Sequence, residues 1–204
     1  MRLTITTFVT LDGVMQGPGG PEEDRRGGFD LGGWTVPLFN QELGGYMDEV
    51  FRHADAFLLG RRTYDIFAGY WPHVTGEEGG VVGERLNRLP KYVATNRTDE
   101  LTWSGAQRLA GNLATAVAEL KARPGAELQV HGSGALAHSL MAEGLIDVYR
   151  TLVFPVVLGR GLRLFAEGAP PAGLRLTDHR TSRTGVTMLT YESAGAPAFG
   201  SMGA

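Results

Sequence analysis

The hydrophobic pattern of the chain predicts short buried strands that alternate with helices. Apolar runs with the length and residue types of strands occur at 2–11, 54–59, 91–95, 128–131 and 149–158. Between the last two, Leu136, Ala137, Leu140 and Met141 recur at helical spacing, so a short helix is expected there. The stretch 128–159 therefore predicts a parallel βαβ crossover, around which the rest of the chain is organised.

Other segments give weaker but usable patterns. Helices are predicted at 34–52, with Pro37 in the first turn, at 61–67 and at 112–121. Residues 75–90 are rich in glycine and predict a loop that has room for a short helix before Pro90. Alternation over 174–191, broken near Thr184-Gly185, predicts an antiparallel hairpin at the sheet edge.

Composition narrows the class of protein. The chain has 204 residues, of which 43% are hydrophobic and 20% charged, which fits one globular domain over 1–193 and a tail of small residues over 194–204. No apolar run approaches the ~20 residues of a membrane span, and the first strand reaches Asp12 too early for a signal peptide. We therefore expect a cytoplasmic protein that does not bind a membrane.

The sequence lacks the residues that several kinds of catalytic and metal-binding site require. Because there are no cysteines, disulfides, thiol catalysis and cysteine zinc sites are excluded. The histidines show no paired ligand spacing, so no metal site is predicted, and neither a G-x-S-x-G nor a P-loop motif is present. The net charge of -3 and the lack of a basic stripe argue against a nucleic-acid partner.

A glycine turn opens the helix of the crossover. Gly132-Ser133-Gly134 precedes the helix N-terminus, where unpaired N–H groups and the helix dipole favour an anion such as a pyrophosphate. With Ala137 the turn fits the G-x-G-x-x-G/A pattern, but residues 150–158 lack the acid that usually holds a ribose hydroxyl. A phosphate-binding turn and a tight turn without a ligand are both compatible with this spacing.

Arginines stand beyond two other strand ends. Arg61 and Arg62 begin a helix whose dipole they oppose, at about 0.3–1 kcal/mol each, and Arg97 follows the third strand. Either an anion compensates these charges, or the guanidinium groups reach water or pair with Asp65, Glu22 or Glu23. Since the carboxyl ends of parallel strands meet at one edge of a sheet, a shared anion site is expected there.

The remaining candidates lie around the same edge. Asp12-Gly13 ends the first strand, and is either a plain turn or a carboxylate that meets a ligand. Residues 15–33 contain seven glycines and no periodicity, as in a lid or a disordered loop. Aromatic side chains at helical spacing are expected in the core and in the cleft wall; they are Tyr64, Phe67, Tyr70 and Trp71.

Four motifs, in their order along the chain, resemble those of the dihydrofolate reductase superfamily. They are TLDG at 10–13, LLGRRTYDIF at 58–67, YVATNR at 92–97 and HGSGALAHSLMAEGLIDVYRTLVFPVVLG at 131–159. The chain looks most similar to the reductase domain of the bifunctional riboflavin-biosynthesis deaminase-reductase, over residues 2 to about 191. This resemblance implies an α/β fold with three α/β/α layers, a mostly parallel sheet and the C-terminal hairpin. It also implies a homodimer.

The resemblance further implies an NADPH site and a cleft for a small heterocyclic substrate. Its cofactor-binding positions match Gly60, Arg61, Arg62, Thr63, Thr95, Asn96, Arg97, Gly132, Ser133, Gly134, Ala135 and Leu136, with the arginines facing the 2′-phosphate of NADPH. Asp12 and Thr151 match catalytic positions, and Asp12 is expected to bind the substrate or deliver a proton. Trp34, Phe39, Phe67 and Trp71 are the expected substrate-binding side chains.

One departure bears on the substrate. Folate reductases carry a carboxylate early in the helix after the lid, and alignment of WTVPLFNQE places Phe39 there, with Glu42 one turn later. The sequence therefore favours a reductase similar to 5-amino-6-(5-phosphoribosylamino)uracil reductase, which transfers a hydride from NADPH to a heterocyclic or ribosylamine substrate. A dihydrofolate-type pterin reductase and a non-catalytic nucleotide-binding module remain the alternatives.

Overall fold

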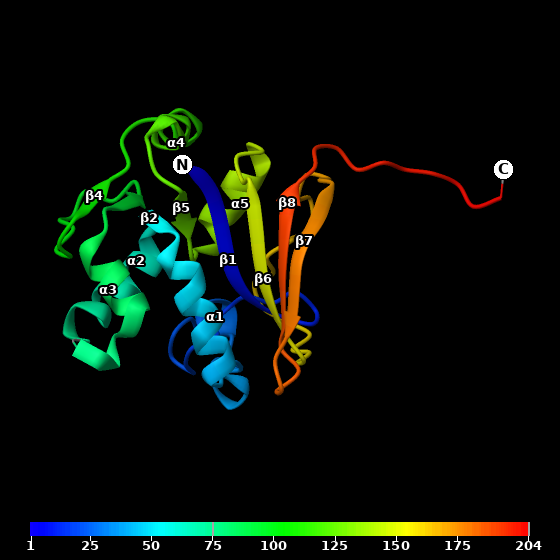
Figure 1. Cartoon of the computed structure of the whole chain (residues 1–204), viewed down its shortest axis with the longest axis horizontal. Helices are drawn as coiled ribbons and strands as arrows, with labels where there is room; N and C mark the ends of the chain where they lie inside the picture. Colours follow the sequence, from blue (N-terminus) through cyan, green and yellow to red (C-terminus); the bar gives the residue numbers. More distant parts are fainter. Residues whose placement is uncertain (75, 204) are drawn as a thin grey trace.

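The computed structural model describes residues 1–74 and 76–203, and within them the chain builds one sheet with the strand order β4-β3-β2-β5-β1-β6-β8-β7 (Figure 1). The strands are β1 Arg2–Thr10, β2 Ala54–Gly60, β3 Lys91–Ala94, β4 Ala106–Arg108, β5 Glu127–Val130, β6 Val148–Phe154, β7 Leu174–Thr181 and β8 Thr187–Ser193. From β4 to β6 all neighbours are parallel, whereas β8 is antiparallel to β6 and to β7. The mostly parallel sheet and its C-terminal hairpin are thus confirmed.

Helices cover both faces of the sheet. They are α1 Gln41–Arg52, α2 Arg61–Ala68, α3 Gly80–Arg88, α4 Leu113–Ala122 and α5 Gly134–Ala142, with 3-10 turns η1 Arg26–Gly28, η2 Val36–Leu38, η3 Trp71–His73 and η4 Gly76–Glu78. Buried side chains of α1, α2 and α3 share one apolar cluster, and those of α4 and α5 share another. The three-layer α/β/α architecture follows. The predicted crossover from β5 through α5 to β6 is confirmed, and β1 lies between its two strands in the sheet.

Strand β1 lies in the middle of the sheet and is buried on both faces. Leu3 and Ile5 pack in the cluster of α4 and α5, while Thr4 and Thr6 are buried on the opposite side. Leu11, the last residue of the strand predicted over 2–11, lies beyond the strand end and is 69% exposed.

Some elements differ from the prediction. The helix predicted from Trp34 starts at Gln41, because Pro37 forms a separate 3-10 turn and the side chain of Asn40 caps the helix by accepting from the Leu43 N–H. β6 ends at Phe154, directly before Pro155. The short strand β4 was not predicted. The short helix that the segment 75–90 had room for is present as α3; residue 75 lies outside the described residues.

The loop 15–33 is held in place by Gln16. The buried amide of this side chain donates to the carbonyls of Asp24 and Arg26 and accepts from the Leu162 N–H at 2.9 Å. The indole N–H of Trp34 donates to the Gln16 carbonyl at 2.9 Å. The loop therefore forms an ordered wall at the carboxyl edge of the sheet, and the alternative of a disordered loop is wrong.

After β8 the chain leaves the domain and runs away from it as an extended tail (Figure 1). Among the described residues, no helix has both the length and the apolar character that a membrane crossing requires.

Candidate active site

A cavity of about 820 Å³ opens at the carboxyl ends of β1, β2 and β5, within the size range of ligand-binding pockets. Its walls come from Thr6–Phe8 of β1, from the loop after β1, from α1 and α2, and from the turn 131–134. Five of the predicted cofactor-binding residues line it: Arg62, Thr63, Gly132, Ser133 and Gly134. The structure thus brings together the glycine turn and the start of α2, which are far apart in sequence.

Two turns make direct contact beside this cavity, and we call this contact the α2–α5 junction; it comprises residues 60–63 and 132–134. The Gly60 N–H donates to the Gly132 carbonyl at 3.2 Å. A Cβ atom on Gly60 would lie 2.2 Å from the Ser133 hydroxyl oxygen, and one on Gly132, where φ is +127°, would lie 2.7 Å from the Thr63 hydroxyl oxygen. Only glycine fits at these two positions.

The two helices that start at the junction have no side-chain caps. Gly60 and Ser133 are the residues before α2 and α5; Gly60 has no side chain, and the Ser133 hydroxyl accepts no hydrogen bond from the first turn. Their first backbone N–H groups therefore lack the usual side-chain acceptor. Together with the two helix dipoles, this makes the junction favourable for a negatively charged ligand group.

Arg62 carries a positive charge to the same cavity. Its Nη2 donates to the Glu23 carbonyl at 2.9 Å and lies 3.2 Å from the Asp24 carboxylate, while its Nε is buried without a partner. Burial opposes ionisation of Asp24, but the hydrogen bonds and charge of Arg26, together with the charge of Arg62, lower the pKa of this carboxyl overall. Arg62 thus links α2 to the loop and keeps one N–H available.

Several buried polar atoms at the cavity have no partner in the protein. Of the residues that the structure describes, Thr6, Thr7, Arg61 and Arg62 each have a buried side-chain nitrogen or oxygen without a hydrogen bond. Three of these residues, Thr6, Thr7 and Arg62, line the cavity. An unsatisfied buried polar atom costs about 1–3 kcal/mol, so this clustering indicates a wall built for a polar ligand.

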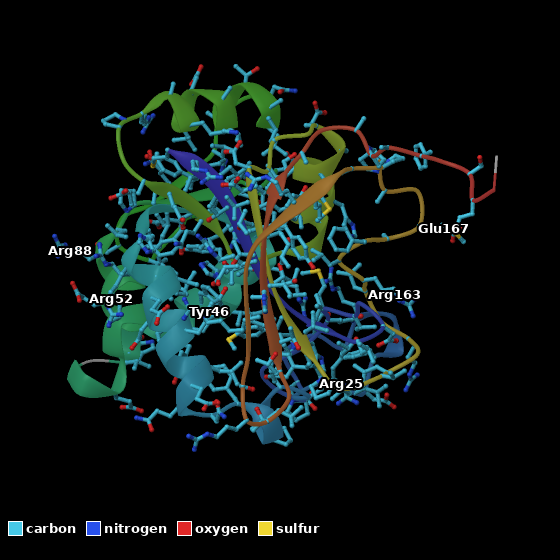
Figure 2. The ribbon with its side chains drawn as sticks, turned by 45° about the vertical axis from the view of Figure 1, so that its right-hand side comes forward. Arg25, Tyr46, Arg52, Arg88, Arg163 and Glu167 are labelled. Carbon is cyan, nitrogen blue, oxygen red and sulfur yellow. The ribbon has the colours of Figure 1, made fainter. Side chains whose placement is uncertain are left out.

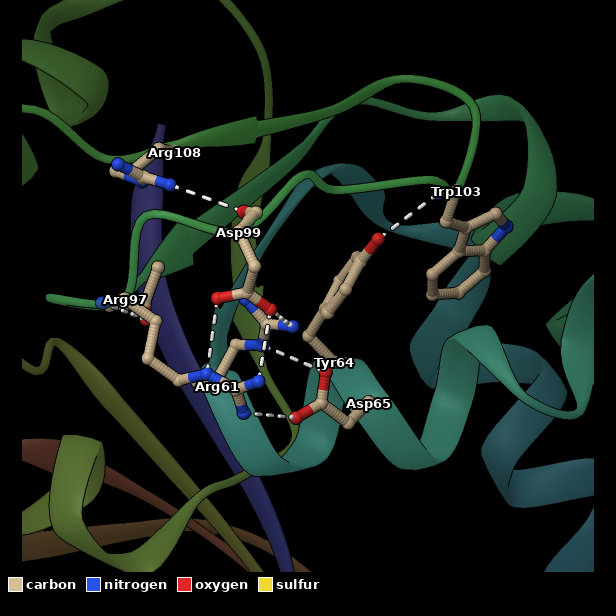
Figure 3. A network of polar contacts seen from close by, with 8 residues as sticks. Arg61, Tyr64, Asp65, Arg97, Asp99, Trp103 and Arg108 are labelled. Atoms are coloured by element: carbon tan, nitrogen blue, oxygen red, sulfur yellow. Dashed lines mark hydrogen bonds and ion pairs between the residues drawn. The ribbon is translucent and has the colours of Figure 1, made fainter.

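Beyond the junction, a group of charged side chains that we call the rim cluster comprises Arg61, Asp65, Arg97, Asp99 and Arg108 (Figure 3). Arg61 donates to Asp65 at 2.8 Å and to Asp99, and Arg97 donates to Asp99 at 2.9 Å. Arg108 donates to the Asp99 carbonyl at 3.3 Å. Three guanidinium groups against two carboxylates leave a formal charge of +1, and Nη1 of Arg61 is buried without a partner.

The rim cluster bears on the two alternatives for the arginines, which were an ion pair within the protein or a bound anion. Arg61 does pair with Asp65, as the first alternative expects. The surplus positive charge and the unpartnered nitrogen of Arg61 nevertheless leave the cluster able to attract an anion. The turn Thr95-Asn96-Arg97 belongs to this region, because the Arg97 N–H donates to the Thr95 hydroxyl at 3.1 Å. None of these three residues lines the cavity itself.

The structure does not bring the two predicted catalytic residues to the cavity wall. Asp12 accepts from the Thr10 hydroxyl at 2.6 Å and from the N–H groups of Leu158 and Gly159 at 3.2 and 2.8 Å. The Thr10 hydrogen bond, with the backbone bonds that outweigh burial, lowers the pKa of Asp12 to about 2. Thr151 is buried beside Thr7 in the sheet, one strand away from the wall. Asp12 thus has the partners of a turn-stabilising carboxylate.

Of the predicted substrate-binding aromatics, Phe39, Phe67 and Trp71 line the cavity. Trp34 does not, because its ring packs edge-on against Phe154 in the core, with centroids 5.3 Å apart. Ala135 and Leu136 also lie outside the wall, and Leu136 is a buried core residue under α5.

Glu42, the remaining candidate for a folate-type acid, is engaged elsewhere. Its carboxylate accepts from the Arg183 N–H at 2.8 Å and lies 3.2 Å from the Arg183 guanidinium, in the β7–β8 turn. It does not line the cavity.

The polar cavity residues that were not predicted as site residues include Gln16, Glu23 and His131. Burial raises the pKa of Glu23 despite opposing hydrogen bonds from Gly19 and Gly20, so this carboxyl is the wall group best suited to hold a proton. The position of His131 directly before the predicted ligand turn was a usable signal for a site residue.

Comparison with known proteins agrees with this geometry. A family model described as the RibD C-terminal domain matches residues 2–189. The uncharacterized protein YyaP of Bacillus subtilis is 25% identical over 191 residues, which cover 93% of this chain and 94% of YyaP.

Solved structures share the fold at low identity. A candidate riboflavin biosynthesis protein of Shewanella sp. PV-4 superposes with a TM-score of 0.71 at 22% identity, covering 95% of this chain and 99% of that one. The deaminase/5-amino-6-(5-phosphoribosylamino)uracil reductase of Thermotoga maritima gives 0.60 at 14%, covering 95% and 56%. Dihydrofolate reductase of Enterococcus faecalis, complexed with NADP(H), gives 0.59 at 11%, covering 95% and 96%. The fold is thus dihydrofolate reductase-like, and the family match over nearly the whole chain shows that this protein belongs to the RibD C-terminal domain family.

Proposed function

We propose that this protein is an NADPH-dependent reductase that acts on a small heterocyclic or ribosylamine substrate. The observation that carries the proposal is the α2–α5 junction, where two uncapped helix starts and Arg62, whose Nε is buried without a partner, meet beside one large cavity. Membership of the RibD C-terminal domain family and a dihydrofolate reductase-like fold support a reductase.

The residues at the carboxyl edge fit NADPH as the cofactor. Arg62 and the backbone N–H groups of the junction would hold the pyrophosphate, because they combine a guanidinium with two helix N-termini. The rim cluster would hold the 2′-phosphate through its surplus positive charge and the unpartnered Nη1 of Arg61. When bound, NADPH supplies the hydride.

The protein's own contribution is placement and proton supply. Phe39, Phe67 and Trp71 provide an apolar wall that would orient a flat substrate and exclude water around it. Glu23 is the group that we propose keeps a proton available, since its raised pKa favours the neutral acid. Asp12 does not take this role in the proposal, because its oxygens are used within its own turn.

A dihydrofolate-type reaction has less support. It would need a carboxylate on α1 that faces the substrate, and Glu42 instead pairs with Arg183. Phe39 stands on the wall where the folate enzymes are expected to carry the acid.

The test is a calorimetric titration of NADPH and NADH against the wild-type protein and Arg62→Ala. Loss of a charge-assisted hydrogen bond in a buried site predicts roughly 10-fold to 100-fold weaker binding of both nucleotides. Arg88→Ala is the matched control, because this arginine projects from the outer surface of α3 (Figure 2) and, within the part of the chain that the structure describes, forms an ion pair with Glu84 alone. Equal binding by wild type and Arg62→Ala would contradict the placement of the pyrophosphate.

A further inference from the structure

A chain of hydrogen bonds runs within the sheet and ends at the cavity. Arg150 on β6 donates to both carboxylate oxygens of Glu127, at 3.0 and 2.6 Å. Gln129, two residues along β5, donates from Nε2 to Glu127 at 2.7 Å and to the Val50 carbonyl at 2.7 Å. His131, two residues further, places its Nε2 3.0 Å from Oε1 of Gln129.

This chain determines which ring nitrogen of His131 carries the proton. The carbonyl of Val50 can only accept, so the amide NH2 of Gln129 must face it, and Oε1 must face the histidine. Because Oε1 has no hydrogen, Nε2 of His131 is the donor, and in the neutral ring Nδ1 carries a lone pair. The ring plane is fixed as well, since it stacks on Phe51 with centroids 4.4 Å apart and 19° between planes.

Burial and the nearby charge of Arg150 keep the His131 ring neutral. Burial, followed by the nearby charge of Arg150, lowers the pKa of this imidazole to about 3, and only Glu127 opposes the shift. At neutral pH the ring is thus an acceptor at Nδ1 and holds no spare proton. Among the described residues no protein donor reaches Nδ1, and His131 forms part of the cavity wall.

Thr6 lies beside His131 on the neighbouring strand. Ile5 pairs with Val130, and both belong to the cluster of α4 and α5, so the next residues along each chain, Thr6 and His131, face the opposite side. The Thr6 hydroxyl is buried without a partner, and Thr6 belongs to the lining of the same cavity. Thr6, whose hydroxyl can donate, and His131, whose Nδ1 can only accept, therefore occupy neighbouring positions on the same face of the sheet.

From this geometry we propose that His131 Nδ1 and the Thr6 hydroxyl recognise the amide or imide edge of an uncharged heterocycle. Nδ1 accepts from a ring N–H, and Thr6 donates to the adjacent carbonyl. Gln129 and Glu127 are positioning residues that fix the tautomer. The inference names the substrate class of the reductase proposed above and rests on that function only for the presence of a heterocycle in the cavity.

The experiment is NMR of the full-length protein labelled with 15N in its histidines. The probes are uracil, which has imide N–H groups, and 1,3-dimethyluracil, which has the same carbonyls and no N–H. His131 is assigned from the spectrum of His131→Gln. His138 is the internal control, because it is half-buried on α5 and, among the described residues, its one hydrogen-bond partner is the Arg163 carbonyl.

We expect Nδ1 of His131 to be unprotonated in the free protein and to shift on addition of uracil, while His138 does not move. Since N-methylation leaves Nδ1 without a donor, dimethyluracil should bind at least about 10-fold more weakly and leave this resonance in place. In Gln129→Met the His131 ring loses the acceptor that selects its tautomer, so both ring nitrogens should become partly protonated while the histidine is retained. A ring protonated at Nδ1, equal effects of the two uracils, or no binding of uracil would each overturn the proposal.

The outcome is separable from that of the reductase proposal. A response of His131 to uracil without any consumption of NADPH would leave the recognition pair standing and remove the reductase. Consumption of NADPH with no change in the His131 resonance would support the reductase and remove the recognition pair.

Discussion

The Asp12 turn and the α2–α5 junction both lie at the carboxyl edge of the sheet, but they differ in whether their polar groups have hydrogen-bond partners within the protein. The Asp12 carboxylate accepts from one hydroxyl and two backbone N–H groups, and Arg163 lies 3.5 Å away. At the junction, two helix starts lack caps and Arg62 has a buried nitrogen without a partner. The first arrangement stabilises a loop, whereas the second is prepared for a ligand.

This difference shows why the type of a residue and its position at a strand end are insufficient to identify a functional group. Asp12, Arg61 and Arg62 all lie within two residues of a strand end, and the family resemblance implied a ligand-binding role for all three. Their partners separate them, and these partners come from segments distant in the chain, such as Leu158, Asp99 and Asp24.

The largest expected effect comes from closing the junction. In Gly60→Ala the new methyl group would meet the Ser133 hydroxyl at 2.2 Å and the Ser133 backbone nitrogen at 2.9 Å, so the two turns must separate. We expect a loss of about 2–3 kcal/mol in the free energy of unfolding, measured by urea denaturation. Gly44→Ala, on α1 with open space around its Cβ, should not lose stability. Similar stability of both variants would show that the junction is not tightly packed.

A smaller effect is expected at the rim cluster. Arg97 is largely exposed, so Arg97→Ala should leave folding intact while lowering the surplus charge near the proposed 2′-phosphate. Affinity for NADPH should fall about threefold to tenfold, and affinity for NADH should not change. Raised salt should diminish the preference for NADPH in the wild type. A parallel loss for both nucleotides would place Arg97 outside the 2′-phosphate site.

The smallest effect concerns the pH dependence of the Asp12 turn. The pKa of Asp12 is about 2 in the folded protein and 3.8 for the unperturbed group, so its contribution to stability is present above 3.8 and is lost as pH falls through 2. Asp12→Asn should therefore lower the unfolding free energy by about 1 kcal/mol at pH 7, with a difference that shrinks below pH 4. A difference independent of pH would contradict the ionised, hydrogen-bonded state of Asp12.

The sequence predicted those parts of the fold that depend on apolar patterning. Leu136, Leu140 and Met141 are buried as their helical spacing indicated, and the hairpin turns near Thr184-Gly185. Strand β4 escaped prediction because Ala106–Arg108 is short and has no alternation, and its pairing with β3 depends on tertiary structure. The early end of β6 and the late start of α1 follow from single prolines and a cap.

The site residues were predictable where the backbone conformation requires a particular residue type. They were less predictable where the role of a side chain depends on its hydrogen-bond partners. Both Gly132 and Gly134 lie at the cavity, and a Cβ atom would meet Thr63 at the first position and Leu162 at the second. His131 packs in the structure by stacking on Phe51. Its acceptor role could not be foreseen, since it depends on Gln129 being oriented by the Val50 carbonyl.

The most direct test of the central proposal is consumption of NADPH by the full-length protein in the presence of 5-amino-6-(5-phosphoribosylamino)uracil, the substrate named for the related Thermotoga maritima enzyme. We predict steady oxidation of NADPH by the wild type. Glu23→Gln should slow this turnover while NADPH binding is retained, because the proton that Glu23 holds is lost. Binding of NADPH without oxidation, with this substrate and with dihydrofolate, would contradict the proposal and identify a nucleotide-binding protein without catalysis.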